Sequence, residues 1–385
     1  MLRSIQYKDI CQLMLVDCSM RSSADKIERL LHYRCNSRTL DDWSEQEGRT
    51  IIDTIQLLSR EILKENKFDE DTGLPVDIST LEDELKNPDI ASISPEKVLK
   101  AIVKHNENRP DDEKISEEWA NTRYFSASEG VNISIDDVGV TEQKSTGRQK
   151  GSPPKDKKKR VENTVVHIQQ GFGTYVFTGL GMLSVVKTTL AFSLANNLLE
   201  NHMVTFFVDG APNIRNSIQS IFGFRPYEVV LDWHHLDRKC AQRLSQIMKG
   251  IKLRNEAYKS LVKFLWYGEL DKAIEFLRNI PEDKIKHGGL EHIEKLIDYF
   301  ERNRNNIPCY SLRKELGLRN SSNRVEKSND LVVAERQKNR GMSWSRAGST
   351  ALANITAMRL NGESSAWNYT KQLRFSLNYY MQNVA

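Results

Sequence analysis

Three acidic residues occupy positions typical of ligands for divalent metal ions. Asp136 and Asp209 each end an apolar segment with strand character, residues 131–136 and 204–209, and Glu326 lies in the first turn of a predicted helix. Carboxylate oxygens are hard ligands suited to Mg²⁺, and two such ions about 3.5–4 Å apart can hold both the attacking and the leaving oxygen of a phosphoryl displacement. The order strand-Asp, strand-Asp, helix-Glu therefore predicts a two-metal site for phosphoryl transfer.

Each of these acidic residues also has a purely structural interpretation. Asp136 and Asp137 could form a turn at a strand end, and only one of them can point to the same face as Asp209. Alternation places Asp136 on the face opposite the apolar side chains, and Asp137 stays an auxiliary candidate. Asp209 could instead cap the helix that follows it. Glu326, with an asparagine three residues before it, fits a capping box.

Four sequence blocks, taken in order, resemble one known protein family. They are the strand ending at Asp136, Val-Asp-Gly-Ala at residues 208–211, Val-Leu-Asp-Trp-His-His-Leu at 230–236, and the block from Glu326 to Trp344. Together they resemble bacterial insertion-sequence transposases of the DDE type, over roughly residues 130 to 360. That family belongs to the ribonuclease-H-like superfamily of nucleotidyltransferases.

The resemblance implies an α/β fold with a ribonuclease-H-like mixed sheet, and DNA as the substrate. Asp136, Asp209 and Glu326 would be the catalytic residues and would bind two Mg²⁺ ions, with Mn²⁺ as a substitute. The enzyme would cleave a phosphodiester at the element's terminal repeats and transfer the 3′-OH into target DNA, as a homodimer or higher homo-oligomer. A nuclease of the same fold without strand transfer, and a transposase-derived DNA-binding protein without catalysis, stay open as alternatives.

A second polar cluster follows the apolar segment at residues 228–231. Asp232 is predicted as an auxiliary carboxylate, and His234 as an auxiliary group near the metal ions or DNA. For His235 we prefer a local hydrogen bond at the strand end. The only support for a zinc site is the pattern His-His-x4-Cys that ends at Cys240, and this pattern alone does not predict one.

Basic residues gather in two segments, 144–160 and 313–346, although the net charge is only +4. Local basic stripes neutralise phosphates, so both segments are predicted to contact DNA. Trp344 could stack on an unpaired base, but a place in the core is preferred for it. The predicted DNA-contacting residues are Lys157, Lys158, Lys159, Arg160, Arg319, Arg324, Arg336, Lys338, Arg340 and Trp344.

Residues 181–189 imitate a nucleotide-binding P-loop. Val186 stands where such a loop needs a glycine, because the backbone N–H groups must wrap a phosphate. We therefore predict an amphipathic helix over residues 184–200, with Lys187 in solvent.

The length of 385 residues predicts two or three domains. Residues 37–48 look like a short helix closing on Gly48, which suits either a helix-turn-helix or a plain three-helix bundle. The predicted units are a helical, possibly DNA-binding part over 1–65, an acidic linker with short helices over 66–126, the first part of the catalytic core over 127–236, an all-helical insertion over 237–312, and the catalytic helix with the C-terminal segment over 313–385.

Hydrophobic periodicity places the elements of the core and insertion. Strands are predicted at residues 131–136, 164–168, 174–177, 203–208 and 228–231, and helices at 184–200, 213–222, 238–266, 269–279 and 291–304. Three strands, a helix, a strand, a helix, a strand and a final helix follow the ribonuclease-H order.

The remaining features predict a cytoplasmic protein, and the resemblance implies that it is bacterial and associated with the nucleoid. No apolar run approaches the roughly 18–20 residues of a membrane span, and the N-terminus has no apolar signal core. The five cysteines form no C-x-x-C pair, so neither a disulfide framework nor a zinc knuckle is indicated.

Overall fold

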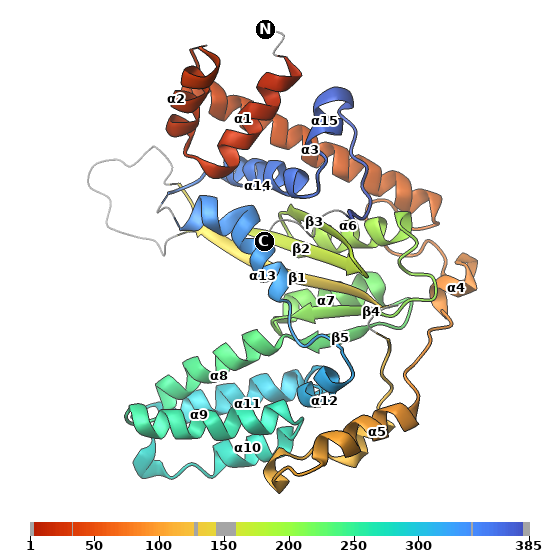
Figure 1. Ribbon diagram of the computed structural model, residues 1–385, viewed down its shortest axis with the longest axis vertical. Helices are drawn as coiled ribbons and strands as arrows, with labels where there is room; N and C mark the ends of the chain where they lie inside the picture. The colour runs from red at the N-terminus through yellow and green to blue at the C-terminus, as the bar shows by residue number, and fades with distance from the viewer. Residues whose placement is uncertain (1–3, 33, 127–129, 144–158, 340–341, 380–385) are drawn as a thin grey trace.

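The computed structural model describes residues 4–32, 34–126, 130–143, 159–339 and 342–379, and gives only the backbone of residues 323–325. Within the described residues, five strands form one mixed sheet in the order β3-β2-β1-β4-β5 (Figure 1). The first three strands pair antiparallel, and β4 and β5 run parallel to β1. Their bounds are β1 Val131–Thr141, β2 Arg160–Gln170, β3 Gly173–Gly179, β4 Val204–Val208 and β5 Glu228–Leu231. All five predicted strands are confirmed, and β1 and β2 are longer than predicted.

Alternating side chains of the strands enter two different cores, one on each face of the sheet. Ile133 and Ile135 of β1 pack with helices α6 (Met182–Ala195) and α7 (Pro212–Phe222). Val138 and Val140, on the other face, pack with the segment after residue 330 and with helix α14 (Arg346–Leu360). The second face is covered by α13 (Asn323–Asn329), the π-helix η6 (Asp330–Lys338) and α14 (Arg346–Leu360).

The N-terminal helices share cores with the C-terminal segment. Their bounds are α1 Ile5–Asp17, α2 Met20–Leu31 and α3 Ser37–Glu65, and α3 packs against α6 and α14. The predicted short helix over residues 37–48 is wrong, because α3 runs for 29 residues. Gly48 lies inside it, and a Cβ there would come within 2.4 Å of Ala351 of α14. This glycine therefore lets two helices cross closely and does not end a helix. Residues 37–48 thus do not form the short second helix that a helix-turn-helix requires.

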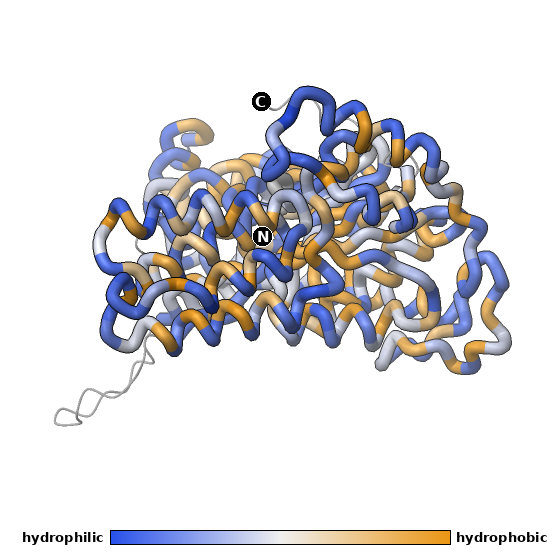
Figure 2. Tube along the Cα trace, turned by 90° about the horizontal axis from the view of Figure 1, so that it is seen from below, coloured by the Kyte–Doolittle hydropathy of each residue, from blue (hydrophilic) through white to orange (hydrophobic). Residues whose placement is uncertain are grey.

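A second, helical lobe fills the lower part of Figure 1. The predicted helix over 238–266 is two helices, because the chain turns at Gly250, whose φ is 82°. The other two predicted helices of the insertion are confirmed. Figure 2 shows hydrophobic and hydrophilic residues alternating along the helices, as expected when one side of each faces a core. The bounds are α8 Trp233–Ile247, α9 Ile251–Trp266, α10 Leu270–Arg278 and α11 Gly289–Arg302.

The linker packs onto the helical lobe. Helix α5 (Pro95–Asn106) shares a small core with Leu312 of α12 (Tyr310–Glu315) and with Tyr267. No helix in the described part of the chain combines the length and apolarity needed to cross a membrane. The remaining described elements are α4 Asp83–Lys86, α15 Ser364–Thr370 and the 3-10 turns η1 Ile78–Thr80, η2 Asp111–Glu113, η3 Glu117–Asn121, η4 Glu282–Lys284 and η5 Arg304–Asn306.

Candidate active site at the ends of the central strands

Asp136 lies on β1, and Asp209 is the first residue after the neighbouring parallel strand β4. The register of β1 and β4 pairs Ser134 with Phe207, and each aspartate comes two residues after its member of this pair. Asp136 faces the side of the sheet that α13 covers, because Asn329 of α13 donates a hydrogen bond to it. Asp209 lies near enough for its charge to act on the carboxylate of Asp136.

Asp136, and not Asp137, faces this side. Its Oδ2 accepts a hydrogen bond of 2.6 Å from Nδ2 of Asn329 on α13, and its Oδ1 accepts one of 2.9 Å from the N–H of Asp137. The carboxylate of Asp137 instead accepts a hydrogen bond of 2.5 Å from the hydroxyl of Thr164 on β2. Asp136 thus lies on the face that alternation predicted for it, and Asp137 is directed away from α13.

The electrostatics of Asp136 reflect a crowded acidic site. Burial raises the pKa of Asp136 to about 6; the nearby His235 opposes this rise and the charge of Asp209 adds to it. A carboxylate that is both desolvated and close to a second carboxylate favours a bound proton or a bound cation.

A tight turn holds Asp209. Its Oδ1 accepts a hydrogen bond of 2.8 Å from the N–H of Ala211, and no side chain caps helix α7. Gly210 has a φ of 84°, and a Cβ there would lie 2.9 Å from Leu231 and 3.1 Å from the amide of Asn303. Glycine is therefore required at this position, and the helix-cap interpretation of Asp209 is wrong.

Glu326 points towards two histidines at the start of α8. Its Oε1 lies 3.7 Å from Nε2 of His234 and 3.7 Å from Nε2 of His235. Helix α13 has Ser322 as its N-cap residue, without a side-chain cap hydrogen bond, so the predicted capping box with Asn323 as the cap is wrong. The carboxylate of Glu326 is thus directed to the end of the sheet where the aspartates lie.

Asp232 has a structural role that differs from the predicted auxiliary carboxylate. It is only 1% exposed, and it caps α8 because its Oδ1 accepts a hydrogen bond of 3.0 Å from the N–H of His235. Its Oδ2 accepts a hydrogen bond from the N–H of Ser322, immediately before α13. Both oxygens are therefore engaged with backbone groups, and Asp232 joins the helix that carries Glu326 to the helix that carries the two histidines.

The carboxylates of Asp136, Asp209 and Glu326 are suitable ligands for a metal ion, but in this structure they are not arranged as a metal site. Among the described residues, no group of three or more His, Cys, Asp or Glu side chains is gathered closely enough to hold a metal ion. Carboxylate oxygens of Asp136 and Asp209 accept hydrogen bonds from other groups of the protein. The hard oxygen donors nevertheless suit Mg²⁺, and the buried Oδ1 of Asn329 has no hydrogen-bond partner among the described residues. Side-chain rotation would be needed to close the site.

Two predicted DNA contacts are buried in the core. Arg336 is 2% exposed; it donates a hydrogen bond of 3.1 Å to the carbonyl oxygen of Leu15 and stacks over the ring of Trp344. Trp344 in turn donates a hydrogen bond of 3.1 Å to the carbonyl oxygen of Gln337. The prediction of DNA contact is therefore wrong for Arg336, and the core interpretation of Trp344 is confirmed. The ring of Trp344 and the carbonyl oxygen of Leu15 give this buried guanidinium a stacking partner and a hydrogen-bond acceptor.

The other predicted DNA contacts have mixed positions. Lys159, Arg160 and Lys338 are exposed, and Arg319 is half-buried. Lys157, Lys158, Arg340 and the side chain of Arg324 lie outside the described residues.

Sequence reasoning missed two residues at this site. Asn329 follows Glu326 by three residues, so helical spacing could have placed both on one face. Arg238 is exposed and lies 3.3 Å from Nδ1 of His235. One helical turn after His234, it brings a cation to the edge of the site.

The P-loop imitation and a partly open pocket concern other parts of the molecule. Nζ of Lys187 donates a hydrogen bond of 2.9 Å to the carbonyl oxygen of Asp71, so it ties α6 to the linker instead of lying free in solvent.

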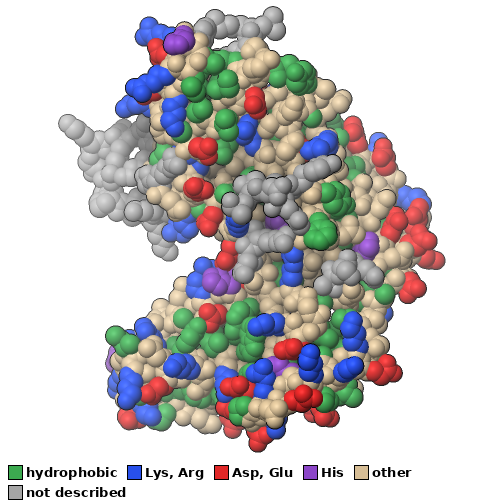
Figure 3. Space-filling model, viewed as in Figure 1, with side chains coloured by type: hydrophobic (Ala, Val, Ile, Leu, Met, Phe, Trp, Pro, Cys, Tyr) green, Lys and Arg blue, Asp and Glu red, His purple; other side chains and the backbone are tan. Residues whose placement is uncertain are grey.

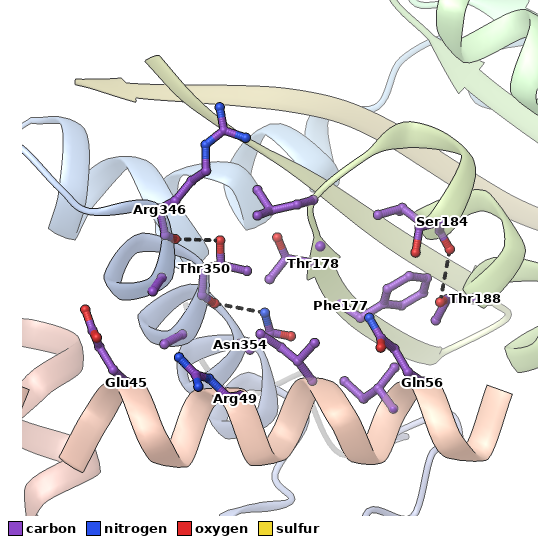
Figure 4. A pocket seen from close by; sticks show the side chains of 17 residues that line it. Glu45, Arg49, Gln56, Phe177, Thr178, Ser184, Thr188, Arg346, Thr350 and Asn354 are labelled. Carbon is purple, nitrogen blue, oxygen red and sulfur yellow. Dashed lines mark hydrogen bonds between the residues drawn. The ribbon is translucent and has the colours of Figure 1, made fainter. Parts of the chain in front are cut away.

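A cavity of about 260 Å³ lies between α3, β3, α6 and α14 (Figure 4). Phe177 contributes to its apolar wall, Glu45, Arg49 and Arg346 are among its polar residues, and no predicted catalytic residue lines it.

Comparison with known proteins identifies no relative of this chain. No protein-family model matches it, and neither the curated proteins nor the solved structures contain a match.

Proposed function

We propose that this protein is a Mg²⁺-dependent DNA transposase of the DDE type, with a ribonuclease-H-like core. The observation that carries the proposal is the placement of Asp136 on β1 and of Asp209 directly after the adjacent parallel strand β4, close to the helix that bears Glu326. The strand order β3-β2-β1-β4-β5, with two parallel strands added to an antiparallel three-strand unit, also supports it. Because β1 and β4 are adjacent and parallel in this order, their C-terminal ends point to the same edge of the sheet.

The three acidic residues have distinct parts in this proposal. Asp136 and Asp209 would hold the metal ions on the rigid sheet, and Glu326 would complete the ligand set from α13. When bound, the ions would polarise the scissile phosphate and lower the pKa of the attacking water or 3′-OH. His235, between Asp136 and Glu326, would orient the glutamate through its imidazole.

The DNA would approach through a hollow between the two lobes. Figure 3 shows this hollow between the sheet and the helical lobe, with basic and histidine side chains at its edge. Arg238 is exposed at the start of the lobe, and Tyr299 of α11 fixes the lobe to the site by donating a hydrogen bond of 2.9 Å to the carbonyl oxygen of Asp209. The lobe therefore has a defined position from which phosphates can be held.

Cleavage and joining of DNA that carries candidate terminal repeats would test the proposal. We expect the wild type to cut at the repeat end and to join the 3′-OH to target DNA with Mg²⁺ or Mn²⁺. Asp209→Asn and Glu326→Gln should each lower cleavage by more than about 100-fold, since removing even an outer group of a metal site costs about 10–100-fold. DNA binding should survive, because both changes reduce negative charge.

Glu335→Gln serves as the control, because Glu335 is exposed on the neighbouring helix. Cleavage without joining would indicate the nuclease alternative. Binding without metal-dependent cleavage would indicate the non-catalytic alternative, and near wild-type cleavage by Glu326→Gln would refute the assignment of that residue.

A further inference from the structure

We propose that Asn329 belongs to the metal site: its Nδ2 restrains Asp136 while no cation is bound, and its Oδ1 joins the oxygen ligands when Mg²⁺ or Mn²⁺ enters. This inference rests on the proposed function, since it concerns the same carboxylates. It adds a neutral oxygen donor to a site that otherwise consists of charged carboxylates.

The buried amide of Asn329 makes a hydrogen bond at one end only. The residue is 6% exposed, and its Nδ2 lies 2.6 Å from Oδ2 of Asp136. Its Oδ1 is buried and makes no hydrogen bond within the described residues. An unsatisfied buried acceptor costs about 1–3 kcal/mol, so a fold that keeps one beside a carboxylate leaves it ready for a partner.

The position of Asn329 on its helix supports the same conclusion. It follows Glu326 by three residues, so the two side chains project from one face of α13 towards the sheet. The π-helix η6 begins at the next residue, Asp330. Wider helical turns of this kind occur frequently at functional sites, where they change the direction of side chains relative to a regular helix.

The chemistry of the carboxamide suits both states. The N–H₂ group donates to a carboxylate that has no cation, and the carbonyl oxygen is an accepted ligand for hard divalent ions. The two ends of the amide are nearly equal in size, so rotation about the last side-chain bond exchanges them in place. A cation on Asp136 would repel the N–H₂ group and attract Oδ1, so entry of the ion itself favours the exchange.

Mn²⁺ titration of the full-length protein would test this inference without depending on activity. Free Mn²⁺ is measured by its electron paramagnetic resonance signal, and folding of each variant by circular dichroism. Asn329→Leu keeps the shape but removes both polar ends, and we expect it to weaken Mn²⁺ binding by about 10-fold or more. Asn329→Asp keeps an oxygen at the position of Oδ1, so it should bind Mn²⁺ at least as tightly as the wild type.

Asn163→Leu is the matched control. Asn163 is also a buried amide whose Oδ1 has no hydrogen-bond partner among the described residues, but its Nδ2 donates to Ser349 of α14. Its replacement should leave Mn²⁺ affinity unchanged. If Asn329→Leu does not fold, Asn329→Asp decides: binding at wild-type strength or tighter supports the oxygen ligand.

The outcomes separate this inference from the proposed function. If Asp209→Asn abolishes Mn²⁺ binding but Asn329→Leu leaves it unchanged, the metal site stands and the role of Asn329 is refuted. Loss of binding in Asn329→Asp as severe as in Asn329→Leu refutes the oxygen ligand. If the wild type binds no Mn²⁺ that depends on Asp209, both proposals fall.

Discussion

At the scale of single residues, burial determines what the acidic side chains can do. Asp136 is desolvated beside Asp209, whereas Asp232 is more deeply buried but satisfied by two backbone N–H groups. A carboxylate with both oxygens bonded to backbone is a structural element, and one with a carboxylate neighbour is a candidate ligand. Glu363 presents a third case, because it is 1% exposed, lies remote in sequence from the candidate site, and leaves Oε2 without a hydrogen bond among the described residues.

Glu363 should make the stability of the protein depend on pH. Burial raises its pKa from 4.5 to about 7, against the hydrogen bond that it accepts from the N–H of Phe375. The native state therefore binds this proton more tightly than the unfolded state, and the free energy of unfolding falls as pH rises from about 4.5 to about 7. The loss is up to about 3 kcal/mol.

Glu363→Gln should remove this loss, so that the variant is more stable than the wild type at pH 8 and similar to it near pH 4.5. Urea unfolding across this range measures the difference. Glu335→Gln, at an exposed position, should keep the wild-type profile. A Glu363→Gln profile with the wild-type slope would show that another group titrates.

At the scale of elements, the relative placement of α8 and α13 decides whether the candidate site exists. Asp232 follows β5, caps α8 and accepts the N–H of Ser322, and the N–H of Trp233 donates a hydrogen bond of 3.0 Å to the carbonyl oxygen of Asn320. These bonds cross the whole helical insertion. They join the histidines of α8 to the glutamate of α13 although the two helices are far apart in the chain.

Asp232→Ala should destabilise the protein by about 1–3 kcal/mol, because it removes a helix cap and leaves two buried N–H groups without partners. We also expect weaker Mn²⁺ binding, since α13 loses its tie to α8. Urea unfolding and Mn²⁺ titration measure the two effects. Asp283→Ala, at an exposed position in the insertion, should change neither. Stability within experimental error of the wild type would contradict the tie between the helices.

At the scale of the whole molecule, a central sheet is enclosed by helices from both ends of the chain, and the helical lobe stands to one side. Figure 3 shows a hollow between the two parts of the molecule. Arg313, only 3% exposed, pairs with Glu228 of β5 at 2.7 Å and helps to fix the lobe to the sheet. The net charge of +4 is small, so DNA affinity must come from local groups of basic residues.

The basic segment that precedes β2 should supply part of this affinity. Neutralising Lys157, Lys158, Lys159 and Arg160 together should reduce the slope of log affinity against log salt by up to about 3–4, about one for each phosphate that the variant no longer neutralises. A filter-binding or anisotropy titration at several salt concentrations measures the slope. Neutralising Lys249, Lys252 and Lys284, which are exposed on the helical lobe, provides the comparison. An unchanged slope in the first variant would place the DNA on the lobe instead.

The sequence by itself determined the local structure of this protein. Strand and helix periodicity located the five strands and most helices, because side chains must alternate between core and solvent at fixed intervals. The same alternation placed Asp136 on the face of its strand opposite the apolar residues. These features depend on neighbours along the chain, so they are visible without a structure.

Only the tertiary structure decided which distant residues meet. Asn329 contacts Asp136 across 193 positions, Asp232 contacts Ser322 across 90, and the buried Arg336 contacts Leu15 across 321. Gly48 shows the same limit, because its missing Cβ admits a helix that lies far along the chain. An amino-acid pattern cannot distinguish a glycine that ends a helix from one that lets two helices touch, nor a surface arginine from a buried one. Packing determines both, because it depends on the three-dimensional neighbours that satisfy each polar group.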